Sequence, residues 1–301
     1  MTRDSAHTKP IEYIARTRAW YLALGYPEPY RWAQADTVVL SKPRKPLPEC
    51  TLGIITTAAP FRADAGDQGP GAPYNGKAKF FDVYAASTRA PPRLGISHVA
   101  IDRAHTTAED TASFFPLAAY QRAVARGELG AVADRFYGLP TDRSVRRTLD
   151  TFAKDLLDLC REDAVDVAAL VPNCPVCHQS VSLVANLLEQ AGIATVILGC
   201  ALDIVQHVGA PRLLFSDLPL GNAAGPPHDT AAQDDIAIQS VALLRDANTP
   251  RTTWHSAATW PGASRWRDNY SNPDLLSAEE LAAKRAEFER VKSERATQSN
   301  M

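Results

Sequence analysis

Two cysteines and a histidine stand together in the segment Cys-Pro-Val-Cys-His, at Cys174, Cys177 and His178. Thiols separated by two residues can bind a metal ion, cycle through a disulfide or hold a nucleophile. A histidine next to them can donate or accept a proton. The spacing therefore predicts a chemical site, in which we expect all three residues to be catalytic.

A strand followed by a helix is expected to position these thiols. The apolar run 164–171 is typical of a buried strand, and the pattern after Cys177 predicts an amphipathic helix that ends near Gly192. Free amides and the helix dipole at such a helix start stabilise a thiolate. This placement suits a nucleophile at Cys174 and, one turn later, a resolving thiol at Cys177.

Zinc is the main competitor for a pair of this kind. A structural zinc site takes four ligands, usually from two such pairs. The other cysteines of the chain, Cys50, Cys160 and Cys200, are isolated in the sequence. We therefore expect no metal at Cys174 and Cys177.

Strand and helix patterns alternate along most of the chain. This alternation predicts an α/β fold with a mostly parallel sheet flanked by helices, a Rossmann-like three-layer arrangement with the site at the strand carboxyl ends. We expect an aromatic-rich arm with a helix over 1–49, a catalytic α/β domain over 50–250, with two similar α/β halves as one option, and a C-terminal extension with a charged helix over 251–301. Strands are predicted over 50–61, 81–87, 95–103, 164–171, 193–198 and 211–219, and helices over 116–129, 144–160, 230–246 and 278–293.

Further polar residues are candidates for substrate binding. One group lies close to the end of the strand predicted over 95–103, and another lies in the loop 221–227, whose free amides could close on a ligand. His228 is either a ligand-binding residue or part of a helix start capped by Asp229. The expected substrate-binding residues are His98, Asp102, Arg103, Asn173, Asn222 and His228.

Composition excludes several classes of partner. The net charge is −2 and the pI about 6.4, which gives no general attraction to nucleic acid or to an anionic membrane. No apolar run approaches the roughly 20 residues that span a bilayer, and the polar start MTRDSAHTKP does not resemble a signal peptide. An odd number of cysteines, five, fits a reducing compartment. We expect a cytoplasmic protein that binds neither nucleic acid nor membrane.

The run "CPVCHQSVSLVANLLEQAGIATVIL" (174–198) resembles the active-site region of the selenoprotein B family of glycine, sarcosine, betaine and D-proline reductases. In that family a strand leads to selenocysteine-x-x-Cys, followed by a helix and a short strand, and the register matches without a gap. The similarity extends over Pro10 to Asp229 through the segments "YIARTRAWYLALGYPEPYRWA", "LGIITTAAPF", "SHVAIDR", "FFPLAAYQRAVARGELG" and "LPLGNAAGPPHD".

The resemblance implies reductive cleavage of a C–N bond at an activated carbon. Cys174 takes the selenocysteine position and would attack, and Cys177 takes the position of its partner and would resolve the adduct. The reductant would be thioredoxin or a small thiol, and no cofactor is expected within the chain. Expected partners are a small-molecule substrate, a protein carrying a pyruvoyl group or resembling thioredoxin, and a second copy in a homo-oligomer. Sulfur replaces selenium here, and Ser180 stands where the family has a further cysteine.

Two other functions remain open from the residues. One is a cofactor-independent racemase or lyase of the aspartate/glutamate racemase type, which needs a second thiol, Cys50 or Cys200, facing Cys174. The other is a protein that senses metal or redox state through the cysteine pair. The reductase hypothesis needs both Cys174 and Cys177.

Overall fold

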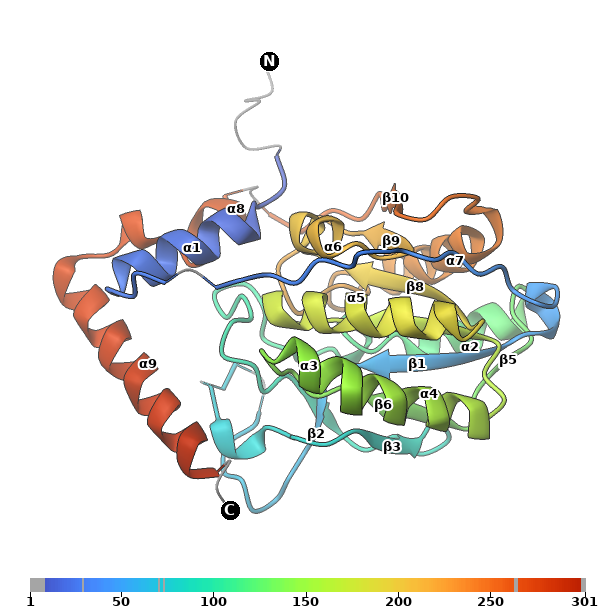
Figure 1. The fold of residues 1–301 in the computed structure, drawn as a ribbon, viewed down its shortest axis with the longest axis horizontal. Helices are drawn as coiled ribbons and strands as arrows, with labels where there is room; N and C mark the ends of the chain where they lie inside the picture. The colour runs from blue at the N-terminus through green and yellow to red at the C-terminus, as the bar shows by residue number, and fades with distance from the viewer. Residues whose placement is uncertain (1–8, 29, 70, 73, 263–264, 299–301) are drawn as a thin grey trace.

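An eight-stranded sheet forms the centre of the computed structural model, which describes residues 9–298 except 29, 70, 73, 263 and 264 (Figure 1). The strand order is β10-β9-β8-β7-β1-β6-β3, with β5 paired to β1. Of these pairs, β3 with β6 is antiparallel and the others are parallel. The strands are β1 (Thr51–Thr56), β3 (Tyr84–Ser87), β5 (Ala131–Val132), β6 (Arg135–Gly138), β7 (Val167–Val171), β8 (Ala194–Gly199), β9 (Arg212–Phe215) and β10 (Thr252–His255); β2 (Ala59–Pro60) and β4 (Leu94–Gly95) form a separate antiparallel pair.

Helices cover both faces of the sheet. Helices α4 and α5 pack on one face, and α2 and α7 pack on the other (Figure 1). Among the helices of the described residues, none combines the length and apolar character that a membrane span requires. The helices are α1 (Tyr13–Ala23), α2 (Leu117–Ala125), α3 (Val145–Arg147), α4 (Ala153–Glu162), α5 (Pro175–Gln190), α6 (Leu202–Val208), α7 (Thr230–Asp246), α8 (Trp266–Asn269) and α9 (Ala278–Gln298), with a π-helical turn, η5 (Thr148–Phe152), between α3 and α4.

Strand β7 shows how the two layers share the sheet. Val167, Ala169 and Val171 belong to the core that contains α2 and α7. Ala168 and Leu170 belong to the core that contains α4 and α5. Successive side chains of a strand point to opposite faces, so a fully apolar strand is what a sheet covered on both sides requires.

The carboxyl ends of β1 and β7 form a topological switch point. The chain leaves β1 toward β6 on one side and leaves β7 toward β8 on the other side. In open parallel sheets the ligand-binding crevice lies at such a point. Cys174 follows the end of β7 directly, so the fold places the cysteine pair there.

The predicted fold class is confirmed, and the helix predicted over 230–246 coincides with α7. The strand predicted over 95–103 was wrong. Only Leu94–Gly95 pairs, as β4, and the following residues form turns. Strand β10 belongs to the sheet although it lies beyond residue 250, the predicted end of the catalytic domain. The division of the chain into three regions stays a prediction.

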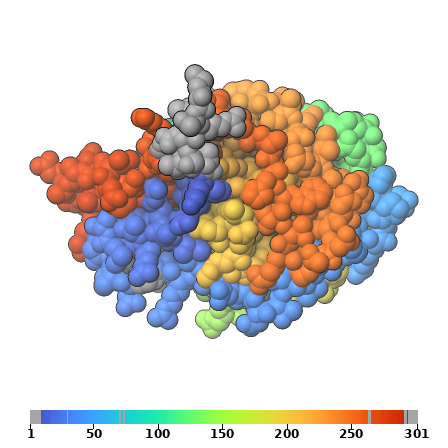
Figure 2. All heavy atoms as spheres, turned by 90° about the horizontal axis from the view of Figure 1, so that it is seen from above, coloured from blue at the N-terminus to red at the C-terminus, as the bar shows by residue number. Residues whose placement is uncertain are grey.

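Helices α1 and α9, from the two terminal regions of the chain, lie at the same end of the molecule, as Figures 1 and 2 show. The rings of Tyr21 and Tyr26 pack against Phe288 of α9, with centroids 5.6 and 5.2 Å apart. Arg16 of α1 donates a hydrogen bond to the carbonyl oxygen of Tyr270 at 2.7 Å. Helix α9 is thus held against α1 at one end of the molecule.

A buried ion pair ties the segment before β1 to the sheet. Glu189 in the last turn of α5 lies 2.7 Å from Arg212 of β9, and neither side chain is exposed. The carboxylate also accepts hydrogen bonds from the amides of Ser41 and Thr195. Arg212 donates to the carbonyl oxygen of Ser41 at 2.6 Å. Each buried charge is therefore paired and hydrogen-bonded, which such charges need in order to be tolerated.

Candidate active site

The two thiols meet at the first turn of α5. Cys174 is the N-cap residue, and its sulfur accepts a hydrogen bond from the amide of Cys177 at 3.3 Å. Pro175 occupies the first helical position, where no amide donor is needed. Cys174 is 4% exposed and Cys177 is not exposed at all. The helix start therefore places one thiol behind the other.

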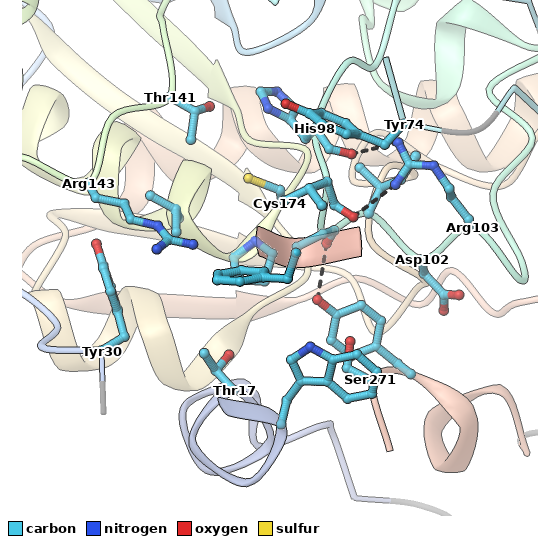
Figure 3. Close-up of a pocket in the computed structure, with 18 of the residues that line it drawn as sticks. Thr17, Tyr30, Tyr74, His98, Asp102, Arg103, Thr141, Arg143, Cys174 and Ser271 are labelled. Atoms are coloured by element: carbon cyan, nitrogen blue, oxygen red, sulfur yellow. Dashed lines mark hydrogen bonds between the residues drawn. The ribbon is translucent and has the colours of Figure 1, made fainter. Parts of the chain in front are cut away.

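A cavity of about 850 Å³ opens in front of Cys174 (Figure 3). This volume lies toward the upper end of the range for small-molecule sites, about 300–1,000 Å³. Of the two thiols, Cys174 lines the cavity, so a bound molecule meets Cys174 first. The walls come from α1 and the segment after it, residues 74–81, 97–104 and 140–147, residues 269–276, and α9.

His98 reaches the thiols from an earlier loop. Its Nε2 lies 2.7 Å from the carbonyl oxygen of Thr57, at the end of β1. Because a carbonyl oxygen only accepts, Nε2 carries a proton and donates it. The ring also hydrogen-bonds Cys177, which leaves Nδ1 to make that contact. His98 thus connects the carboxyl end of β1 to the first turn of α5 across the switch point.

Arg103 holds the loop that carries His98. Its terminal nitrogens donate to the carbonyl oxygens of His98 at 2.7 Å and Val99 at 2.9 Å. Asp102 is buried and lies 3.0 Å from Nδ1 of His105. Burial raises the pKa of Asp102, although His105 opposes the shift. Both residues line the cavity, and substrate binding by them stays a prediction.

His178 is fixed by three hydrogen bonds to the backbone. Its Nδ1 donates to the carbonyl oxygen of Cys174 at 2.8 Å, and its Nε2 accepts from the amides of Cys200 and Ala201 at 2.9 and 3.1 Å. A Cβ at Gly199 would lie 3.2 Å from the ring, so the glycine leaves room for it. Burial lowers the pKa of His178 to about 4, so the ring is neutral at pH 7. Both ring nitrogens are hydrogen-bonded to the backbone, which favours a positioning role, and the catalytic role expected from the sequence stays a prediction.

Asn173 lies at the switch point next to Cys174. Its backbone and side-chain amides donate to the hydroxyl oxygen of Thr57 at 3.0 and 3.1 Å. Thr57 thereby binds Asn173 through its side chain and His98 through its carbonyl oxygen. These bonds fix the end of β7 relative to the end of β1.

Three of the expected binding residues are not among those that line the cavity: Asn173, Asn222 and His228. Asn222 is 1% exposed and donates to the hydroxyl of Thr106 at 2.6 Å. His228 is exposed, and it precedes Asp229, which caps α7 as the alternative interpretation of this segment proposed. Their expected contact with substrate is not supported by this placement.

The remaining cysteines do not form an opposed pair with Cys174. Cys50 precedes β1, and β1 runs parallel to β7, so Cys50 lies at the opposite edge of the sheet. Cys200 follows β8 at the same edge as Cys174, but it is buried in the apolar core, and burial raises its pKa. The racemase hypothesis needs a second thiol across the substrate, and neither residue lines the cavity.

The pKa values of Cys174 and Cys177 are shifted in opposite directions in the reduced protein. Burial raises the pKa of Cys174, and the adjacent Cys177 raises it further. Burial also acts to raise the pKa of Cys177, but the hydrogen bond with Cys174 and the neighbouring His98 outweigh burial and hold it well below its ordinary value. The hydroxyl of Thr141, 3.1 Å from the Cys177 sulfur, adds to this effect. The lowered pKa therefore favours Cys177 as the thiol that loses its proton first, while the cavity gives access to Cys174.

We expect the reduced, chelator-treated protein to keep one thiolate below the ordinary cysteine pKa of about 8.5. The pKa of Cys177 is lowered, so its thiolate should persist to lower pH than that of an ordinary cysteine and be lost on further acidification. A pH titration of the thiolate ultraviolet absorbance measures this. His98→Gln should move the loss of absorbance to higher pH, Cys177→Ser should remove the low-pH thiolate, and Cys200→Ser should change nothing. An absorbance that survives Cys177→Ser would assign the thiolate to another residue.

Several residues of the site carry no signal in the sequence. Thr141 follows β6 and contacts Cys177. The guanidinium of Arg143 lies 5.7 and 5.8 Å from the ring centroids of Tyr21 and Tyr30 and lines the cavity (Figure 3). These side chains come from segments that meet β7 only in the folded chain, so no local motif could have identified them.

The fold and the site define a class: a three-layer α/β protein with a cysteine pair at its switch point, facing a cavity. Over 84 residues the chain is 31% identical to the D-proline reductase subunit gamma of Acetoanaerobium sticklandii, a match that covers 28% of this chain and 35% of that protein. The chain therefore spans about a third of the length of the curated relative it matches. No family model and no solved structure matches it. The match supports a distant relation to the reductase family.

Proposed function

We propose that the protein is a thiol-dependent reductase that cleaves a C–N or other C–heteroatom bond of a small carboxylated or amino substrate. The observation that carries this proposal is the position of the two thiols: Cys174 faces the cavity, and Cys177 lies behind it with a lowered pKa. The distant similarity to a reductase subunit supports the same class.

The proposed reaction has two displacements. The sulfur of Cys174 attacks the substrate carbon, the C–N bond breaks, and the amine leaves with the electron pair and takes up a proton. The Cys177 thiolate then attacks the sulfur of Cys174, and the S–C bond breaks. The electron pair stays on carbon, which takes up a proton to give a C–H bond. The dithiol has supplied two electrons and is left as the Cys174–Cys177 disulfide.

Proton movements in this reaction follow the hydrogen bonds of the site. Cys174 gives its proton to the leaving amine as it attacks. His98 holds a second proton at Nδ1 against the Cys177 thiolate, because its Nε2 proton is held by the carbonyl oxygen of Thr57. It gives the Nδ1 proton to the carbon when the Cys177 thiolate makes the second displacement. His98 is therefore the acid–base residue of the proposal.

The disulfide must be reduced before the next cycle. The proposal assigns this step to an external thiol, either thioredoxin or a small thiol, by thiol–disulfide exchange. The curated relative is described as a subunit, which supports a protein partner for this chain as well. A second candidate partner, distinct from the reductant, is a protein with a pyruvoyl group, which would activate a substrate amine.

Intact-mass spectrometry tests the proposal. The reduced, chelator-treated protein is incubated without added thiol with α-amino acids, proline and N-methylated amino acids among them. A true substrate should lower the protein mass by two hydrogens, and peptide mapping should place the disulfide at Cys174 and Cys177. One C–N bond should be cleaved for each disulfide formed, which gives a free amine from open-chain substrates and a ring-opened amino acid from proline. Cys200→Ser should behave as the parent protein. Repeated turnover without any thiol or disulfide would contradict the proposal.

A further inference from the structure

His98, Cys174 and Cys177 form a cluster of metal-binding atoms. The ring nitrogen of His98 and the two sulfur atoms lie within 4.8 Å of one another, and all three residues are buried. Two thiolates and one imidazole are ligands that suit zinc and other soft cations. The cysteine pair alone is an incomplete ligand set, and His98 adds the third ligand from a distant loop.

The number of ligands indicates the type of metal site. Structural zinc sites have four protein ligands, whereas sites with three protein ligands keep one position for water or another molecule. His98 and Cys174 line the cavity, so a fourth position would open into it (Figure 3). Ligand atoms around zinc are about 3.5–3.8 Å apart, given bond lengths of 2.0–2.3 Å, so a contraction of about 1 Å would complete the geometry.

The surroundings of the three ligands suit coordination. Nε2 of His98 donates to the carbonyl oxygen of Thr57 at 2.7 Å, the kind of bond that fixes the tautomer and orientation of metal-binding histidines. This bond leaves Nδ1 to face the thiols, and a bound cation would replace the proton there. The hydroxyl of Thr141 and the amide of Cys177 lie at hydrogen-bond distance from the two sulfur atoms, at 3.1 and 3.3 Å.

We propose that reduced Cys174 and Cys177, together with His98, bind one soft divalent cation such as Zn²⁺, with a fourth position open to the cavity. The bound ion occupies both thiols, so metal binding and the disulfide exclude each other. The binding itself is independent of the proposed reductase activity. A second consequence rests on that activity: the cation is a reversible inhibitor that keeps the cysteine pair reduced and inactive.

Cobalt(II) is a spectroscopic probe for this site. The full-length protein is reduced, freed of metal and titrated anaerobically with Co²⁺ in the absence of substrate. We expect saturation at one equivalent, with a thiolate-to-cobalt charge-transfer band and the visible bands of four-coordinate cobalt. Added Zn²⁺ should displace the cobalt and abolish the bands. Titration without these bands would overturn the proposal.

Variants assign the ligands. Cys174→Ser and Cys177→Ser should each weaken binding by at least about 100-fold, and His98→Gln by at least about tenfold. Cys200→Ser, a buried thiol at the neighbouring strand end, should bind as the parent protein does. Unchanged affinity in His98→Gln would overturn the three-ligand site, provided that circular dichroism shows the variant folded.

A measurement on the parent protein covers the case in which His98→Gln does not fold. Dithiodipyridine oxidises the zinc-loaded protein by accepting two electrons from the two thiolates, which form the Cys174–Cys177 disulfide. One Zn²⁺ per protein should then be released to a chromogenic chelator. Disulfide formation without zinc release would overturn the proposal. The reductase test uses chelated protein with substrate, so either proposal can fail while the other survives.

Discussion

Replacing Cys177 with serine is expected to stop the protein halfway through its reaction. Cys174 still faces the cavity and can attack, but no thiolate lies behind it to displace the adduct. A covalent adduct on Cys174 should therefore accumulate to one per protein. Turnover supported by an external dithiol should fall by about 10⁴-fold, the order expected for loss of an essential covalent step. Intact mass and product formation measure the two effects.

The matched variant Cys174→Ser separates the roles of the two thiols. It should show neither adduct nor turnover, because Cys177 is fully buried. The low pKa of Cys177 would make it the better nucleophile if access were equal. An adduct on Cys177 in Cys174→Ser would therefore reverse the assignment made from access to the cavity. Cys200→Ser controls for the loss of a buried thiol.

Replacing Glu189 with glutamine should lower the free energy of unfolding by about 3–5 kcal/mol, because it leaves the buried charge of Arg212 unpaired. Urea denaturation should show a lower midpoint with an unchanged m-value. The ion pair joins α5, β9 and the segment at Ser41, so its loss should destabilise the central sheet and not a peripheral segment.

An exposed ion pair supplies the control for this prediction. Asp158 and Arg161 lie 3.7 Å apart with side chains 71% and 60% exposed, so Asp158→Asn should change stability by less than about 0.5 kcal/mol. Replacing both buried partners, as in Glu189→Leu with Arg212→Met, should recover much of the loss, since no charge stays buried. A loss below about 1 kcal/mol in Glu189→Gln would show that the buried charge is compensated elsewhere.

The elements that carry the cysteine pair could be predicted because their signals are local. The strand before Cys174 is an unbroken apolar run, and the helix after it starts at Pro175 and has periodic apolar residues. Helix α7 was likewise predictable from its cap, Asp229. In each case neighbouring residues alone determine the pattern.

The partners of the cysteines could not be predicted, because they depend on contacts between distant segments. The predicted strand containing His98 is a set of turns whose backbone is held by Arg103. His98 acquires its role only when its ring meets the carbonyl oxygen of Thr57. His178 was predicted to move protons because it adjoins Cys177, but the amides after β8 occupy its free nitrogen. The catalytic role predicted for His178 stays a prediction, and the proposal gives proton transfer to His98 instead.

The walls of the cavity come from both ends of the described chain, and this has a consequence for synthesis. The cysteine pair, His98 and all the strands of the sheet precede residue 256, whereas Tyr270 and Phe288 complete the cavity. A chain emerging from the ribosome therefore exposes its reactive thiols before the segment that encloses them has been made. Newly made protein should be most vulnerable to oxidants during that interval, and docking of α9 against α1 ends it.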